Sequence, residues 1–515
     1  MGPLWRPAGP LGRRLVARLP PVGADAHQGW RPVRLCVLGA LAAGALVLGL
    51  GACSDDGGDP GFSPAHLSLD ELERCQTRFP GPEGYVCGEI QVPYERTDPS
   101  LGTFGLAFAV RERDEADKPS LGTIFAAEGG PGYASTSTAN AYEALFGNLL
   151  KRREMVLIDQ RGTGESAPVD CPELQVGEVP EWISLSDCAR KLGPRFESYR
   201  TAASADDIDD VREALGLDEM TLYGDSYGTY LGQSYAFRYP DTLEALVLDS
   251  AYPARGEDPW YPSLPRTGIR LIDQACERDP DCEGDAGRRL GRLAQVLRDT
   301  RRGVGPLIDA LIGAAYGDAE GYREIDEAGI ALMNGSSRKW RELTEEGKVG
   351  FGRAGRYLRA AELAISCNDY PMIWDRRASE PRRREQLEQA IEDEPDRYGP
   401  FTPREIATYS EIGYLMCLTW PAPTDLRQPA VPGDAEPTEA PVLVVNGEYD
   451  DLTTPHEGRV VASEFPSSEH YVAPDAGHVD SLYYSDRAAA RKIRGFLRSV
   501  YDGSFEPPSG SSDPS

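Results

Sequence analysis

The chain has 515 residues, of which 40% are hydrophobic, and it carries 83 acidic against 54 basic side chains for a formal net charge of -29. This length allows about two to four domains, and the apolar content excludes a disordered chain. The acidity argues against a nucleic-acid partner, because binding to phosphates requires clustered Lys and Arg side chains.

The N-terminal segment, residues 1–52, is predicted to be a lipoprotein signal peptide. Arginines in residues 1–34 precede the apolar run Leu35–Leu50, which is shorter than the roughly 20 residues of a membrane-spanning helix. Leu50-Gly51-Ala52-Cys53 then resembles the bacterial lipobox, in which a peptidase cuts before the cysteine and that cysteine receives lipid. The resemblance implies export, a lipid anchor on Cys53 at the periplasmic or extracellular face of the cell envelope, and a tether over residues 53–74. An ordinary signal peptide is the alternative.

Eight further cysteines predict a disulfide framework, because their number is even and the chain is expected to be exported. Sequential pairing closes short local loops and is the simplest expectation. A zinc site is the alternative, which is disfavoured because the chain has no CxxC pair and no His near these cysteines. The expected pairs are Cys75 with Cys87, Cys171 with Cys188, Cys276 with Cys282, and Cys367 with Cys417.

Short apolar runs rich in β-branched residues predict strands that alternate with helices. A helix is expected over Ala205–Leu215 with Ser204 as its N-cap, and others over residues 226–238 and 483–500. This alternation indicates an α/β fold with a mainly parallel sheet covered on both faces. The predicted strands are Glu89–Pro93, Gly105–Val110, Thr123–Ala127, Glu154–Asp159, Met220–Tyr223, Ala245–Asp249 and Pro441–Asn446.

Residues 256–435 differ in composition from the flanking segments. Strand-like runs nearly vanish, and helix formers with dense charge take their place, as in Arg288–Arg301. The simplest interpretation is one α/β domain interrupted by a helical insertion before the C-terminal strand. The expected boundaries are 75–255 for the first part of the core, 256–435 for the insertion, 436–503 for the second part of the core and 504–515 for a disordered tail.

A candidate nucleophile lies in Gly224-Asp225-Ser226-Tyr227-Gly228, between a predicted strand and a predicted helix. Glycines are needed on both sides of Ser226, because a strained turn leaves no room for side chains where the strand and the helix meet. This context favours a nucleophile elbow over an ordinary turn with an incidental serine.

A serine nucleophile needs a base, and the chain has five histidines. His478 is the first choice, because it follows a turn-rich segment between a strand and the last helix, where a loop can aim it at the nucleophile. His456, expected in a loop after Pro455, and His470, in a strand-like run, stay open as alternatives. His27 would be removed with the signal peptide, and His66 precedes the first strand.

The acid that orients the base is expected between the serine and the histidine along the chain. Asp450 is the first choice, because it lies in the loop after the apolar run Pro441–Asn446. Glu448 and Asp451 are rivals in the same loop, and Asp249 is a rival after an earlier strand. Two backbone N–H groups should bind the oxyanion: one from Tyr227, and one from Gly129 or Gly130 in the turn after Thr123–Ala127.

The order of these motifs resembles the proline iminopeptidase and tripeptidyl aminopeptidase group of α/β-hydrolases. The motifs are Gly129-Gly130-Pro131-Gly132, Asp159-Gln160-Arg161-Gly162-Thr163-Gly164-Glu165-Ser166 and the Ser226 elbow. Gly447–Pro455 with Gly477-His478, and Cys87-Gly88, extend the resemblance over most of residues 75–500. It implies an α/β-hydrolase fold, a helical cap over the active site, and release of short N-terminal peptides or proline. It also implies Ser226, Asp450 and His478 as the catalytic residues.

Glu128 departs from that group, in which many members have His or a Pro/Asn pair before the glycines. A carboxylate beside the oxyanion loop would oppose negative charge in the transition state unless it pointed away. Two hypotheses stay open for Glu128. It holds the ammonium group of a substrate N-terminus, or it is a structural acid bonded to nearby backbone.

The expected function is therefore a serine aminopeptidase that forms an acyl-enzyme on a peptide with a free N-terminus. This chemistry needs no metal or organic cofactor. A lipid anchor would be the protein's link to the membrane. A carboxylesterase acting on small esters is the first alternative, and an inactive hydrolase fold that serves as a binding module is the second.

Overall fold

The computed structural model describes residues 64, 66–69, 72–75, 84–176, 181–256, 258–259, 261, 263–282, 284–346, 357–394, 397–409, 414–424 and 428–507. The predicted signal peptide, Cys53, most of the tether and residues 508–515 of the tail lie outside these ranges. Within them, no helix has both the length and the apolar character that crossing a bilayer demands.

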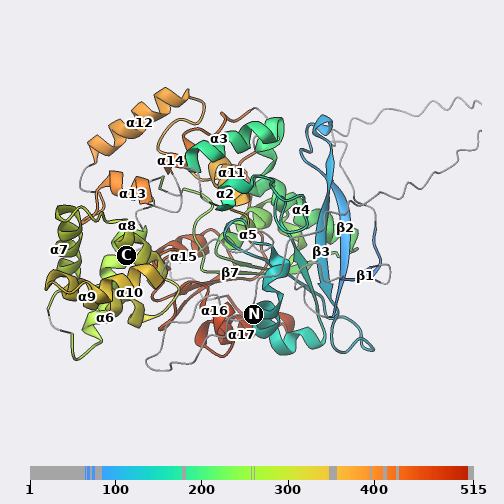
Figure 1. The fold of residues 1–515 in the computed structure, drawn as a ribbon. Coiled ribbons are helices and arrows are strands. Elements are labelled where there is room, and N and C mark those ends of the chain that lie inside the picture. The colour runs from blue at the N-terminus through green and yellow to red at the C-terminus, as the bar shows by residue number, and fades with distance from the viewer. Residues whose placement is uncertain are drawn as a thin grey trace, which may run out of the picture. The chain divides into compact units, whose positions relative to one another are not determined.

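A nine-stranded sheet forms the centre of the protein, in the order β1-β2-β3-β5-β4-β6-β7-β8-β9 (Figure 1). β1, β2, β3 and β5 pair antiparallel, and all the pairs from β5 to β9 are parallel. β4, β5, β6 and β8 are buried along their whole length, which is why they are near-continuous apolar runs in the sequence. The strands are β1 Glu73–Arg74, β2 Tyr85–Pro93, β3 Thr103–Arg111, β4 Thr123–Ala127, β5 Glu154–Ile158, β6 Met220–Asp225, β7 Leu243–Asp249, β8 Val442–Gly447 and β9 Ser468–Ala473.

Helices cover both faces of the sheet. Side chains of α1 and α17 share one hydrophobic core with the sheet, and those of α4, α5 and α15 share another. This arrangement confirms the predicted α/β-hydrolase fold class with a mainly parallel central sheet. The α-helices outside the insertion are α1 Ala139–Phe146, α2 Pro172–Val176, α3 Glu181–Leu192, α4 Thr201–Ala214, α5 Tyr227–Arg238, α15 Pro455–Ser463, α16 Asp480–Tyr483 and α17 Ala488–Tyr501. The 3-10 helices are η2 Pro99–Leu101, η3 Ser135–Thr138, η4 Gly147–Lys151, η5 Gly193–Ser198 and η6 Pro240–Thr242.

Three local predictions were wrong. α4 begins at Thr201, so Ser204 lies inside the helix and does not cap it. The backbone N–H and the hydroxyl of Thr201 donate to Asp369 Oδ2 at 2.5 and 2.6 Å, so a distant side chain satisfies this helix end. His456 lies in α15, which begins with a capping box, and not in a loop. The C-terminal helix begins at Ala488 and not at residue 483, and a separate short helix, α16, precedes it.

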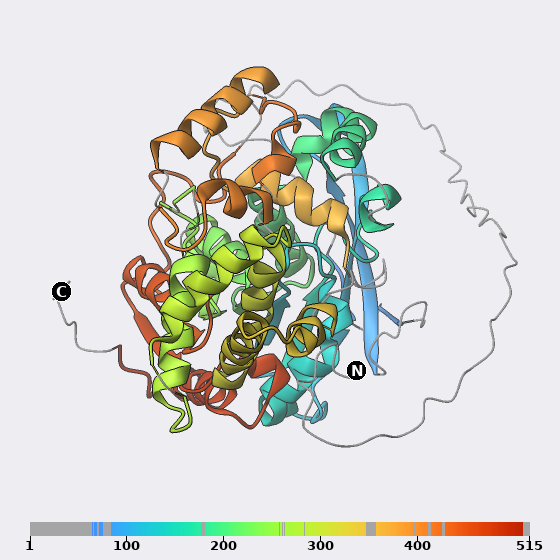
Figure 2. The ribbon, with the colours of Figure 1, turned by 60° about the vertical axis from the view of Figure 1, so that its left-hand side comes forward.

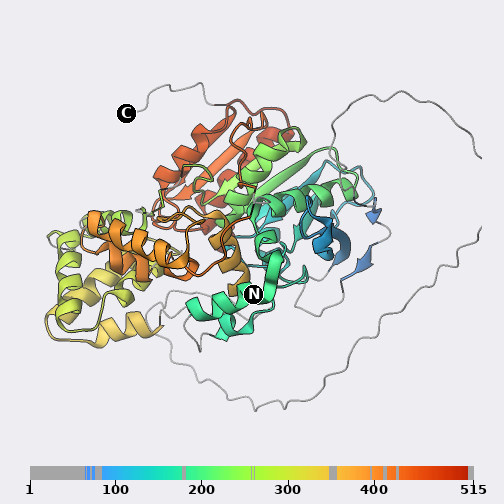
Figure 3. The same cartoon turned by 90° about the horizontal axis from the view of Figure 1, so that it is seen from above.

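The segment between β7 and β8 contains only helices in its described parts, and it contributes to two cores. Side chains of α6 to α10 form a core of their own, whereas those of α11 join the core on the α5 face of the sheet. Figure 3 shows the yellow-green helices of the insertion on the side opposite the blue strands. In Figure 2 the orange helix α12 lies at the periphery, in agreement with the burial of only Arg383 and Leu387 among its side chains. The helices are α6 Ser263–Glu277, α7 Ala286–Asp299, α8 Gly305–Ala314, α9 Ala319–Met333, α10 Arg338–Glu346, α11 Arg359–Asp369, α12 Glu380–Asp393, α13 Pro403–Tyr409 and α14 Tyr414–Cys417.

The eight cysteines form disulfides in the sequential order that was expected. One bridge lies at the β1–β2 edge, one holds the second half of α3 to the residue before α2, one lies in the insertion, and one joins α11 to α14. The pairs are Cys75–Cys87, Cys171–Cys188, Cys276–Cys282 and Cys367–Cys417.

Candidate active site

Ser226 occupies a strained turn between β6 and α5. Its φ of 51° lies in the left-handed region, which residues other than glycine rarely adopt. A Cβ at Gly224 would lie 2.1 Å from the carbonyl oxygen of Gly228, and a Cβ at Gly228 would lie 2.1 Å from that of Ala127. Both glycines of the motif are therefore required by close backbone contacts.

His478 lies within hydrogen-bond distance of the serine. Its Nε2 is 2.9 Å from Ser226 Oγ, and the residue is 3% exposed. The loop that carries it, after β9, is fixed on two sides. The backbone N–H of His478 donates to the carbonyl of Ala315, just after α8, at 2.6 Å, and the N–H of Val479 donates to Ser250 Oγ at 2.8 Å. The imidazole orientation thus depends on both the insertion and the core.

Asp450 is the acid that the structure places against the histidine. Its Oδ2 lies 2.9 Å from His478 Nδ1, and the residue is fully buried. The backbone N–H groups of Leu452 and Thr453 donate to its Oδ1 at 3.0 and 2.9 Å, and the Thr453 hydroxyl donates to its Oδ2 at 2.7 Å. Ser226, His478 and Asp450 therefore form one continuous line of hydrogen bonds.

Thr453 was missed by the sequence analysis. Its Oγ1 lies 2.7 Å from Asp450 Oδ2 and also 3.1 Å from His478 Nδ1, so it contacts both members of the pair. The spacing Asp-x-x-Thr at the start of a turn, just before the capping box of α15, is the signal that could have identified it.

The rival acids have other partners. Glu448 forms an ion pair with Arg278, just after α6. Asp249 accepts hydrogen bonds from Tyr223 and Ser481, and burial raises its pKa to about 6. Asp451 is buried beside Asp450, and burial together with the Asp450 charge raises its pKa well above the ordinary range. In the described part of the chain, the carboxylate hydrogen-bonded to His478 is that of Asp450 and none of these three.

The other candidate histidines lie away from the serine. His470 in β9 pairs with Asn446 of β8, with 3.2 Å between Nε2 and Oδ1, and burial lowers its pKa to about 4. His456 is the second residue of α15, and His66 lies against Gly216 at the end of α4. His27 is outside the described residues.

The glycine loop after β4 lies directly against the nucleophile. A Cβ on Gly129 would be 2.8 Å from Ser226 Cβ and 3.3 Å from the backbone nitrogen of Tyr227. The loop is tied to the second motif, because Gln160 Nε2 donates to the carbonyl of Glu128 at 2.7 Å. Gly130 has a φ of 112°, which only glycine adopts without strain. The loop and the start of α5 thus converge on one point beside Ser226, as an oxyanion hole requires.

The Glu128 carboxyl is engaged inside the protein. The Tyr142 hydroxyl lies 3.0 Å from Glu128 Oε2 and 2.9 Å from Asp225 Oδ1, and Glu128 is 9% exposed. These contacts favour the structural hypothesis for Glu128.

A cavity of about 510 Å³ opens beside α5, between the end of α11 and residues 429–431. Tyr230 lines it, one helical turn after Ser226, and its ring stacks on that of Tyr227. Two carboxylates, Asp369 and Asp375, also line it. Arg376 and Arg377 line it as well, so the cavity is large enough for several side chains and carries charges of both signs.

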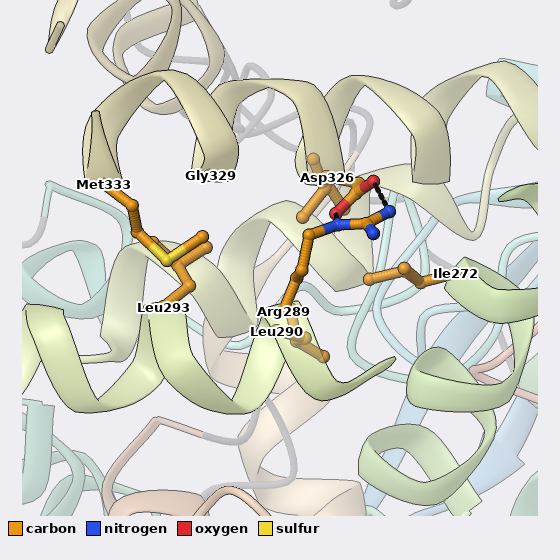
Figure 4. Close-up of a pocket in the computed structure, with 8 residues that line it drawn as sticks. Ile272, Arg289, Leu290, Leu293, Asp326, Gly329 and Met333 are labelled. Atoms are coloured by element: carbon orange, nitrogen blue, oxygen red, sulfur yellow. Dashed lines mark hydrogen bonds and ion pairs between the residues drawn. The ribbon is translucent and has the colours of Figure 1, made fainter. Parts of the chain in front are cut away.

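A second cavity, of about 10 Å³, lies between α7 and α9 in the insertion (Figure 4). An ion pair between Arg289 and Asp326 closes one side of it, and Leu293 and Met333 form another. It holds at most about one water molecule, so it is a packing gap and not a substrate site. Within the described ranges, no group of three or more His, Cys, Asp or Glu side chains is arranged to hold a metal ion.

Two family models match the chain. Residues 123–273 match the model described as the alpha/beta hydrolase fold, and residues 403–502 match the model described as TAP-like protein. The chain is 27% identical to the serine protease Hip1 of Mycobacterium tuberculosis, over 92% of this chain and 97% of that protein. It is 28% identical to the tripeptidyl aminopeptidase of Streptomyces coelicolor, over 79% of this chain and 80% of that protein. It is also 27% identical to the proline iminopeptidase of Aeromonas sobria, over 36% of this chain and 39% of that protein.

Proposed function

From its place among the α/β-hydrolase peptidases, we propose that this chain is a serine aminopeptidase that releases short peptides or proline from substrates with a free N-terminus. The observation that carries the proposal is the hydrogen-bonded line from Ser226 through His478 to Asp450. The relatives named serine protease, tripeptidyl aminopeptidase and proline iminopeptidase support a peptidase over a carboxylesterase. The assembled side chains weigh against an inactive binding module.

In the proposed reaction His478 accepts the proton of Ser226 as its hydroxyl oxygen attacks the substrate carbonyl carbon. Asp450 holds the imidazolium in place, and its own three internal donors fix its orientation. The N–H groups of Tyr227 and of Gly129 or Gly130 bind the oxyanion. The histidine then donates its proton to the leaving amine, and water hydrolyses the acyl-enzyme.

The insertion, residues 256–435, serves as the helical cap in this proposal. The cavity beside Tyr230 supplies a space for the acyl part of the peptide, and its lining carries charges of both signs, from Asp369 and Asp375 and from Arg376 and Arg377. The acidic character of the chain also favours cationic substrates.

Ser226→Ala tests the catalytic assignment. The variant should lose all turnover of chromogenic tripeptidyl and prolyl amides and all labelling by a fluorophosphonate probe, while its circular dichroism spectrum stays that of the wild type. Retained turnover would refute Ser226 as the nucleophile. The same panel of amides with free or blocked N-termini, together with simple esters, separates an aminopeptidase from an esterase.

We further propose that the protein is exported and held at the cell envelope by lipid on Cys53. The lipobox-like Leu50-Gly51-Ala52-Cys53 and the four disulfides support this location, because disulfides persist in oxidising compartments. In the native host, Cys53→Ala should abolish incorporation of labelled fatty acid and move the protein from the membrane to the soluble fraction. Unchanged membrane association would contradict the anchor.

A further inference from the structure

Glu128 and Asp225 stand at equivalent ends of two neighbouring strands. β4 and β6 run parallel, and their last paired residues are Ala127 and Gly224. The next residue along the chain is Glu128 in one case and Asp225 in the other, and neighbouring strands lie about 4.8 Å apart. The two carboxyl groups lie close together there, because both are within hydrogen-bond distance of one hydroxyl, that of Tyr142.

The hydroxyl of Tyr142, from α1, lies between the two carboxyls. Its hydroxyl oxygen is 3.0 Å from Glu128 Oε2 and 2.9 Å from Asp225 Oδ1. The phenol has one hydrogen, so it satisfies only one of these contacts fully. If both acids were ionised, the phenol hydrogen would point to one carboxylate, and the other contact would bring the phenol oxygen against a carboxylate oxygen with no hydrogen between them. At least one proton must therefore reside on the two carboxyls.

The surroundings of the pair offer no cation to balance two negative charges. The titratable groups that face it are Tyr142 of α1, Tyr223 of β6, Asp249 of β7 and Tyr483 of α16. Neither carboxyl forms an ion pair with any residue that the structure describes. Two buried carboxylates without a cation are unstable, and burial raises the pKa of both groups.

We propose that Glu128 and Asp225 share one proton and in this way hold the oxyanion loop against the nucleophile. Glu128 is followed by Gly129 of the loop, and Asp225 is followed by Ser226, so the shared proton joins the two chain segments whose relative position defines the oxyanion hole. Sharing also leaves one negative charge beside the developing oxyanion where two would oppose it. Both acids are positioning residues, and the inference rests on the proposed function for the role of the loop.

Infrared difference spectra of the purified full-length chain at neutral pH test the shared proton without any assay of activity. We expect Glu128→Gln to remove the absorption of one protonated carboxyl, Asp225→Asn to remove one, and the double variant to remove one and no more. Loss of two in the double variant would show two neutral acids, and loss of none would show two carboxylates. Either result overturns the proposal, even if the proposed function is correct.

Kinetics with 4-nitrophenyl acetate and with a peptide amide test the positioning role. Removing an oxyanion donor costs roughly 10²–10³ in kcat, so displacing the loop should cost at least about tenfold. Glu128→Leu should show this loss in kcat with KM unchanged, and Glu128→Gln, whose amide can donate to Asp225, should restore kcat. Glu143→Gln on α1, where Glu143 accepts from Tyr85, is the matched control and should match the wild type.

Two kinetic outcomes count against the pair. Wild-type kcat in Glu128→Leu would show that the loop does not depend on Glu128. A rise in KM for Glu128→Gln that is confined to peptides with a free N-terminus would assign Glu128 to the substrate ammonium. If the wild type hydrolyses neither substrate, the proposed function fails, and the infrared result still decides the shared proton.

Discussion

At the scale of single residues, the sequence could identify some side chains of the Ser226 site and not others. Ser226 lies in a motif whose glycines are sterically required, and few histidines compete for the base. The acid is different, because Glu448, Asp450 and Asp451 share one loop and only the fold decides which carboxylate turns to the imidazole. The contacts of Thr453 and of Glu128 also needed the structure, since their partners depend on a turn in one case and on strand register in the other.

Replacing the acid separates these candidates. Asp450→Asn keeps the shape of the side chain but removes the charge that stabilises the imidazolium, so kcat should fall by roughly 10⁴ with a folded protein. Glu448→Gln is the control from the same loop, and it should stay within about threefold of the wild type, because an exposed ion pair contributes little. Steady-state hydrolysis of a peptide amide measures both. Equal activity of the two variants would remove Asp450 from the mechanism.

At the scale of elements, the buried strands were predictable and the helix ends were not. β4 and β8 are apolar on both faces, so hydrophobicity alone reveals them. β9 has polar and apolar residues in a half-buried run, which gives a weak signal. The start of α4 depends on Asp369, which lies in the insertion, and no local rule can anticipate an acceptor so distant in sequence.

One glycine of the elbow and one exposed glycine of α17 give a matched pair of substitutions. Gly228→Ala places a Cβ 2.1 Å from a backbone oxygen of β4, so it should abolish activity and lower the thermal midpoint. Gly495→Ala in the exposed part of α17 meets no atom within 4 Å and should stabilise the protein by about 0.5–1 kcal/mol through helix propensity. Thermal denaturation and turnover of both variants check this. A stable, active Gly228→Ala protein would contradict the close contact.

At the scale of the whole molecule, the insertion is divided between two cores. The composition of residues 256–435 indicated a helical segment, but not that α11 would pack with the sheet while α6 to α10 form a separate core. The reason is that α11 is buried along almost its whole length, against α2, α3 and the glycine loop after β4, whereas its sequence shows only ordinary helical character.

The two disulfides of the insertion should contribute unequally to the free energy of unfolding. Cys367–Cys417 closes 50 residues and Cys276–Cys282 closes 6. The loop-entropy model predicts a loss of about 4 kcal/mol for removing the first bridge and about 2 kcal/mol for the second. Urea unfolding of the two double Cys→Ser variants measures both losses. A larger loss from the short loop would show that native packing, and not chain entropy, dominates.

The hydrogen bond from His478 to Ala315 ties the proposed catalytic base directly to the insertion. The N–H of His478 donates to the chain just after α8 at 2.6 Å, and a Cβ at Gly477 would collide with Ala315 and Gly317, so no slack separates the two segments. If the insertion moved outward, this bond would break, and the His478 loop would keep only its contacts to the core, through Ser250 and Asp450. Under the proposed function, the insertion would therefore help to hold His478 ready to accept the Ser226 proton, and the space beneath the insertion would limit how much of a peptide is released in one turnover.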